Sequence, residues 1–167
     1  VGTSHIQAEG HWLVLRPAPG DEAPVSWLDA NAFSRSATRA LTVRKVADCC
    51  AALALYGGEY LPDDPYAEWA VPRREELSRL YLAVLLHLAG LYMDRGNARS
   101  ALHSLWSILE ADPCHESAAR AIMRLQAASG RRAEAIRMYR RLTTALKSEL
   151  DLEPDRETQA LFHALRN

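Results

Sequence analysis

The chain has 167 residues, 49% of them hydrophobic and 25% charged, which is enough for one folded domain with a substantial core. The net charge of −1 excludes a general attraction to nucleic acid or anionic membranes, so such binding would depend on local charge clusters. No apolar run approaches the ~20 residues that span a bilayer, and the N-terminus lacks a signal-peptide pattern. We therefore expect a soluble cytoplasmic protein without membrane contact. Val1 in place of Met predicts a fragment or a processed chain.

The first residues predict a short β-hairpin. The pair Glu9-Gly10 precedes an apolar run at 12–15, and two extended stretches around such a pair are typical of a hairpin. Residues 17–24 are rich in proline and predict a linker. We divide the chain into a hairpin and linker at 1–28 and a helical domain at 29–167.

Helical signals begin at Asp29. Its side chain can cap a helix that runs to about residue 40, and Thr42 can cap the next one. Apolar residues recur at helical spacing in both segments. Residues 56–65 contain a glycine pair and two prolines, which forbid a continuous helix, so we expect a loop there.

Prolines frame the next two helices. Asp64-Pro65 is expected to open a short helix, which Pro72 ends or kinks. A long helix is expected from about residue 73 to residue 94, where apolar residues again recur at helical spacing. Trp69 and Trp106 have helical spacing to apolar neighbours, and we expect both in the core.

The second half of the chain repeats itself. Gly96 and Gly130 lie 34 residues apart, and so do Ala101 and Ala135. Each glycine falls where a first helix needs a left-handed cap, and each alanine falls where paired helices need a small side chain. A period of 34 is that of tetratricopeptide units. The residues that define the repeat are Tyr92, Gly96, Ala101, Pro113, Gly130 and Ala135.

Residues 82–150 therefore resemble two tetratricopeptide units, with departures. Gln126 stands where the pattern has Tyr, and Lys147 stands where it has the closing Pro. Ordinary antiparallel helix pairs can produce the same spacing, so the period alone leaves both interpretations open.

Three further segments carry a closer resemblance. They are Trp27 to Phe33, Tyr56 to Pro62 with Trp69 beyond it, and Leu150 to Thr158. In this order and spacing they resemble the bacterial transcriptional activator domain, the tetratricopeptide-like region that follows a winged-helix DNA-binding domain in SARP-type regulators. The resemblance implies an all-α fold of about seven antiparallel helices and a role in transcription activation.

The same resemblance offers an interpretation of the hairpin. It looks like the wing that closes the preceding DNA-binding domain, or it is a hairpin that packs on the first helix, and both alternatives stay open. The chain holds no helix–turn–helix that could read a major groove. DNA is therefore expected to be bound only through an upstream domain.

A search for catalytic patterns finds none. The sequence has no nucleophile elbow, no phosphate-binding glycine loop and no His pair at metal-ligand spacing. Asp63-Asp64 is expected to be a solvated pair, with Asp64 as a helix cap. We expect no catalytic residue, no metal ligand and no cofactor. The three cysteines are expected to be small buried apolar residues: Cys49, Cys50 and Cys114.

Basic residues gather between residues 120 and 147. Four of them fall on one helix face, and we call them the basic strip: Arg137, Arg140, Arg141 and Lys147. This strip contacts DNA phosphates or an acidic partner, or it is a solvated helix face, which we favour.

Helix-pair repeats leave a groove and no preformed catalytic centre. We therefore expect a non-catalytic interaction module of a bacterial transcription activator. Its partners would be the transcription machinery, its own DNA-binding domain or a second copy in a homodimer. The alternative is a small-molecule effector sensor.

Overall fold

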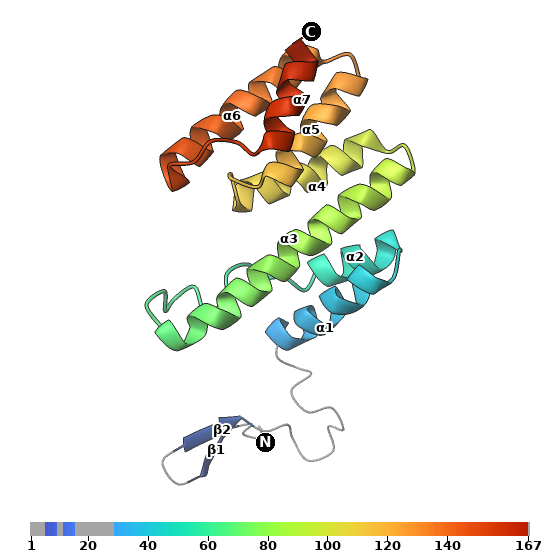
Figure 1. The fold of residues 1–167 in the computed structure, drawn as a ribbon. Coiled ribbons are helices and arrows are strands. Elements are labelled where there is room, and N and C mark those ends of the chain that lie inside the picture. The colour runs from blue at the N-terminus through green and yellow to red at the C-terminus, as the bar shows by residue number, and fades with distance from the viewer. Residues whose placement is uncertain (1–5, 10–11, 16–28, 167) are drawn as a thin grey trace.

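The computed structural model describes residues 6–9, 12–15 and 29–166 (Figure 1). Strands β1 (Ile6–Glu9) and β2 (Trp12–Leu15) pair antiparallel. The predicted linker lies outside the described residues. The predicted role of the first residues, as a wing or as a hairpin that packs on the first helix, stays a prediction.

Residues 29–166 form an all-helical body, which confirms the predicted all-α class (Figure 1). In this part of the chain the structure has seven α-helices and one 3-10 turn. Helix α3 packs against α1, α2 and α4, and α5 packs against α4, α6 and α7. The helices are α1 (Asp29–Thr42), α2 (Val46–Leu53), α3 (Val71–Asp94), α4 (Ala98–Ala111), α5 (Glu116–Ala128), α6 (Arg132–Leu150) and α7 (Arg156–Arg166), and the 3-10 turn η1 (Glu68–Ala70) precedes α3.

Three predictions about helix ends are wrong. Thr42 does not cap α2, because it is the last residue of α1 and its hydroxyl donates to the Arg39 carbonyl at 2.8 Å. Pro72 neither ends nor kinks a helix: it lies in the first turn of α3, where its missing N–H leaves no hydrogen bond unmade. Asp64 caps no helix, since only the 3-10 turn at Glu68 follows it.

The core consists of two apolar clusters that meet at α3. Val84 and Leu88 of α3 face the first cluster, with Phe33 of α1. Leu85 and Ala89 of α3 face the second cluster. Because both faces of α3 are buried, this helix couples the two halves of the domain. The largest fully buried side chains of the second cluster are Leu105, Ile108, Leu109, Ile122, Met123 and Leu142.

The two glycines of the 34-residue spacing end α3 and α5 in the same way. Gly96 has φ +69° and Gly130 has φ +74°, which only glycine adopts without strain. The amide after each glycine donates to the carbonyl five residues earlier, at 2.9 Å and 2.8 Å. Both helix ends are therefore Schellman turns. Of the other repeat residues, Ala101 in α4 and Ala135 in α6 are fully buried, Tyr92 is half-buried in α3, and Pro113 follows α4.

Candidate interaction surfaces

An open hollow of about 480 Å³ lies between the end of α1 and the C-terminal half of α3, and we call it the α1–α3 groove. An ion pair between Arg44 and Asp94, 2.6 Å long and mostly exposed, lies at its edge. His87, a glycine and apolar side chains form the rest, so the groove offers mainly apolar surface between charges of both signs. Its lining residues are Leu41, Arg44, Ala83, Leu86, His87, Gly90, Leu91 and Asp94.

Two residues make this groove suited to a ligand. The Nε2 atom of His87 is buried and has no hydrogen-bond partner among the described residues. A buried unpaired polar atom costs about 1–3 kcal/mol, which a ligand that supplied the partner would recover. Apart from its chain neighbours and the adjacent backbone of α3, no atom lies within 4 Å of where a Cβ at Gly90 would stand, so α3 is open at that point.

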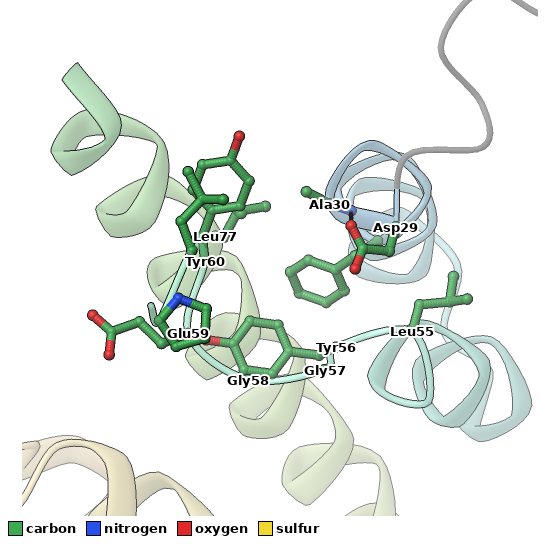
Figure 2. A pocket seen from close by; sticks show the side chains of 12 residues that line it. Asp29, Ala30, Leu55, Tyr56, Gly57, Gly58, Glu59, Tyr60 and Leu77 are labelled. Atoms are coloured by element: carbon green, nitrogen blue, oxygen red, sulfur yellow. Dashed lines mark hydrogen bonds between the residues drawn. The ribbon is translucent and has the colours of Figure 1, made fainter. Parts of the chain in front are cut away.

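A second hollow, of about 320 Å³, lies between α1, residues 55–62 and α3, and we call it the loop cleft. Figure 2 shows Asp29 on one side of it and Tyr60 with Leu77 on the other. The Tyr56 ring lies against Phe33, with centroids 5.0 Å apart, and stacks on the ring of Tyr81 in α3. Burial raises the pKa of Tyr56, so its hydroxyl stays a protonated donor at neutral pH.

Residues 59–70 form an anchored loop. The Arg74 guanidinium donates to the carbonyls of Tyr60 at 3.1 Å and Asp64 at 3.2 Å, and contacts two further loop carbonyls at 3.4 and 3.5 Å. It also pairs with the Glu59 carboxylate at 3.1 Å. Because one cation gathers these groups, the loop has a fixed shape although it lies at the surface.

Trp69 is 72% exposed on this anchored loop, so its predicted place in the core is wrong. In place of the predicted short helix, the chain forms only the turn η1 around Trp69. Tyr66 of the same loop is 90% exposed. Trp106, the other predicted core tryptophan, is half-buried beside the second cluster.

The structure places all four residues of the basic strip on the exposed surface of α6. Arg137 lies 3.9 Å from Glu134, and Lys147 pairs with Asp151. The Arg141 guanidinium lies over the ring of Trp106, 5.3 Å from its centroid. Arg140 has no ion pair among the described residues. The strip is therefore only partly neutralised by its neighbours.

A family model described as the bacterial transcriptional activator domain matches residues 28–166. The chain belongs to this family. The resemblance that the three sequence segments carried is therefore confirmed. Bacterial transcriptional activator domains are a regulatory family and not a known enzyme family. A search of the curated proteins found no match to the chain. No helix within residues 29–166 is both long enough and apolar enough to cross a membrane.

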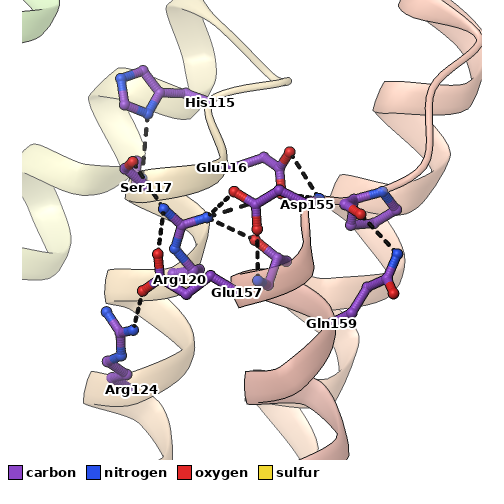
Figure 3. Close-up of polar contacts among 11 residues, drawn as sticks. His115, Glu116, Ser117, Arg120, Arg124, Asp155, Glu157 and Gln159 are labelled. Carbon is purple, nitrogen blue, oxygen red and sulfur yellow. Dashed lines mark hydrogen bonds and ion pairs between the residues drawn. The ribbon is translucent and has the colours of Figure 1, made fainter.

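Within this activator domain, a buried arginine holds the C-terminal helix (Figure 3). The Arg120 guanidinium, on α5, donates to Asp155 at 2.6 Å and to the Thr158 hydroxyl at 2.9 Å. It also pairs with Glu157 at 3.2 Å. The Asp155 carboxylate in turn accepts the Thr158 amide at 2.7 Å and so caps α7. These contacts fasten the segment 150–158, one of the three that carry the family pattern, to α5.

Substituting Asp155 with Asn should make the free energy of unfolding depend less on pH in the acidic range. The Thr158 amide and the Arg120 guanidinium hold the pKa of Asp155 below its usual value, against the desolvation that raises it. Its stabilisation is therefore present above the unfolded pKa of about 3.9 and lost as pH falls through the folded value. Urea denaturation should show the wild type more stable at about pH 7, with the gap closing below about pH 4. A gap that stays constant with pH would contradict this linkage.

The cysteines divide into three environments. Cys49 is buried as predicted, but Cys50 is exposed, so its predicted burial is wrong. Cys114 is half-buried, 3.6 Å from the Glu149 carboxylate. Burial raises the pKa of the Cys49 and Cys114 thiols, so both are protonated at neutral pH. Among the described residues no His, Cys, Asp and Glu side chains gather in a group of three that could hold a metal.

The sequence did not reveal which polar side chains have buried atoms. The sequence patterns single out neither His87 nor Arg120, although the Nε2 atom of His87 and the side chain of Arg120 are buried in the structure. The one available signal was at Gln126, which departs from the repeat pattern and proves to be almost fully buried.

Proposed function

We propose that this domain is the partner-binding module of a bacterial transcription activator, and that its α1–α3 groove receives a segment of a partner protein. The observation that carries the proposal is the unpartnered Nε2 of His87 beside the open surface at Gly90. A hydrogen-bonding atom next to apolar surface suits a peptide, which brings both backbone polar groups and side chains. The domain is non-catalytic and acts in the cytoplasm, and DNA is bound by an upstream domain.

The repeat pattern supports this use of the groove. The matching turns at Gly96 and Gly130, with buried Ala101 and Ala135, favour a tetratricopeptide-like arrangement in which helix pairs stack. Stacked pairs of this kind present extended concave surfaces that bind peptides and domains. A partner from the transcription machinery fits the membership of the chain in an activator family.

Gly90 offers a clean pair of variants to test the groove. Gly90→Phe should fill the groove and weaken binding of purified RNA polymerase subunits at least about tenfold in biolayer interferometry. Gly90→Ala is the matched control, because its Cβ meets no atom within 4 Å. It should keep binding and raise the free energy of unfolding by about 0.5–1 kcal/mol, since Gly90 lies inside α3.

Two results would count against the groove as the partner site. If the wild-type protein bound none of the polymerase subunits, these subunits would be excluded as its partner. Equal binding by Gly90→Phe and Gly90→Ala would show that the partner contacts a different surface. A melting curve for each variant shows that the domain is folded in the assay.

The loop cleft supports a second candidate, a small-molecule effector site. Its volume of about 320 Å³ falls at the lower end of the range for ligand pockets, and it combines apolar walls with Asp29 and the Tyr56 hydroxyl. An effector that binds the folded state raises the melting temperature. A thermal-shift screen with bacterial metabolites tests this, and Tyr56→Phe should reduce the shift if the hydroxyl binds the effector.

A further inference from the structure

A third hollow, of about 200 Å³, opens beside the basic strip, and we call it the aromatic pocket. Trp106 of α4 and Met138 of α6 give it apolar walls. Gln126 of α5 is only 7% exposed, and its side-chain oxygen is buried without a hydrogen-bond partner among the described residues. The guanidinium groups of Arg137 and Arg141 complete the lining. The pocket therefore combines a buried acceptor, apolar walls and positive charge.

One carboxylate also lines the aromatic pocket. Glu134 lies 3.5 Å from Arg131 and 3.9 Å from Arg137, so two cations face its charge. The basic strip adds Arg140, which has no ion pair among the described residues. The pocket and its surroundings thus favour a ligand that brings an aromatic ring, a hydrogen-bond donor for Gln126, and negative charge beside the ring.

The anchored loop of the same chain has these properties. Trp69 is 72% exposed. Its indole N–H is a hydrogen-bond donor that needs an acceptor once the ring is buried. Asp63, Asp64 and Glu68 belong to the same loop and are exposed, without an ion pair among the described residues. Residues 59–72 contain no basic residue at all. Arg74 holds the loop carbonyls between residues 60 and 65, so the backbone that leads to Trp69 is anchored to α3.

We propose that the anchored loop of one copy docks in the aromatic pocket of a second copy. Trp69 enters the pocket and its indole N–H donates to the Gln126 side-chain oxygen, while the loop carboxylates face Arg140 and Arg141. One molecule cannot make this contact with itself, because the loop precedes α3 at one end of the body and α6 lies at the other (Figure 1). The two surfaces differ, so the contact is head-to-tail and can extend to further copies.

This inference deepens the self-association expected from the helix-pair repeats, and it rests on the domain being an interaction module. It uses no residue of the α1–α3 groove. Gly90→Phe should therefore leave self-association unchanged, and the variants below should leave binding of polymerase subunits unchanged. A failure of one proposal is thereby distinguishable from a failure of the other.

Sedimentation velocity of the 167-residue chain tests the contact with two variants. The loop variant is Trp69→Ala, and the strip variant is Arg140→Glu with Arg141→Glu; all three side chains are exposed enough to change without loss of the fold. Wild type should associate with rising concentration, and more weakly at about 500 mM salt than at about 50 mM. Each variant alone should be monomeric. An equimolar mixture should form a dimer and nothing larger, because only one productive loop and one productive pocket are present.

Three results would overturn the head-to-tail contact. One is a wild type that stays monomeric up to about 0.5 mM at low salt, where even weak interfaces associate. This result would exclude the head-to-tail contact, and the acidic loop would then bind a different, basic partner. Association of either variant alone would mean a symmetric or different interface. A mixture that stays monomeric would show that the two surfaces do not meet. Arg79→Glu, an exposed charge reversal on α3 outside both surfaces, should associate like wild type.

Discussion

Replacing Phe33 with alanine should lower the free energy of unfolding by about 3–5 kcal/mol, the usual cost of removing a core aromatic ring. Phe33 is 1% exposed and lies in the cluster that joins α1 and α2 to α3. Its ring also lies 5.0 Å from that of Tyr56, a contact that the variant loses. Urea denaturation followed by circular dichroism measures the change.

Phe33→Leu is the matched control for this site. It keeps most of the apolar volume, so it should cost about 1 kcal/mol. A loss below about 1 kcal/mol for Phe33→Ala would mean that α1 contributes little to the folded body, against its close packing on α3. In Phe33→Ala, hydrogen-exchange protection should fall in α1 and α2 before it falls in the helices of the second cluster. The two clusters share mainly α3, with Leu53 of α2 packed against both.

Replacing Arg120 with methionine should destabilise the domain by about 2–3 kcal/mol, somewhat less than the loss of one partner from a fully buried ion pair. The smaller value follows because the Asp155 and Glu157 side chains remain 45% and 58% exposed and can be hydrated in the variant. The Thr158 hydroxyl, which is fully buried, loses its donor. Thermal unfolding measures the loss, and the exchange protection of α7 should fall first.

Arg124→Met provides the comparison for Arg120. Arg124 is one turn further along α5 and pairs with Glu157 at 2.7 Å, but its side chain is 54% exposed. An exposed pair of this kind contributes at most about 1 kcal/mol, so the control should be close to wild type. Equal losses from both variants would show that burial of Arg120 adds nothing to the attachment of α7.

The helices could be predicted because their signals are local. Gly96 and Gly130 end α3 and α5 through turns that need a left-handed residue, and that requirement is visible in the sequence. The segment around Trp69 could not be predicted in the same way. Its conformation depends on Arg74, whose guanidinium binds carbonyls ten or more residues earlier in the loop, such as that of Asp64. Proline and capping signals near residue 65 favoured a helix, and this distant contact decided against it.

The candidate surfaces were harder to predict than the helices. Periodicity distinguishes apolar from polar positions, but it does not reveal that His87 or Gln126 is buried without a partner. Each residue lines a hollow that residues of other helices help to form, Leu41 of α1 for His87 and residues of α4 and α6 for Gln126. The basic strip was visible in the sequence, whereas the pocket beside it depends on three helices meeting.

Transcription from a reporter promoter tests most directly whether this domain activates through its α1–α3 groove. The chain would be fused to an unrelated DNA-binding domain whose operator lies upstream of the reporter. Wild type and Gly90→Ala should raise transcription, and Gly90→Phe, present at the same level, should lose at least about nine-tenths of the activation. Background transcription with the wild type, or equal activation by Gly90→Phe and Gly90→Ala, would contradict a partner-binding groove in transcription activation.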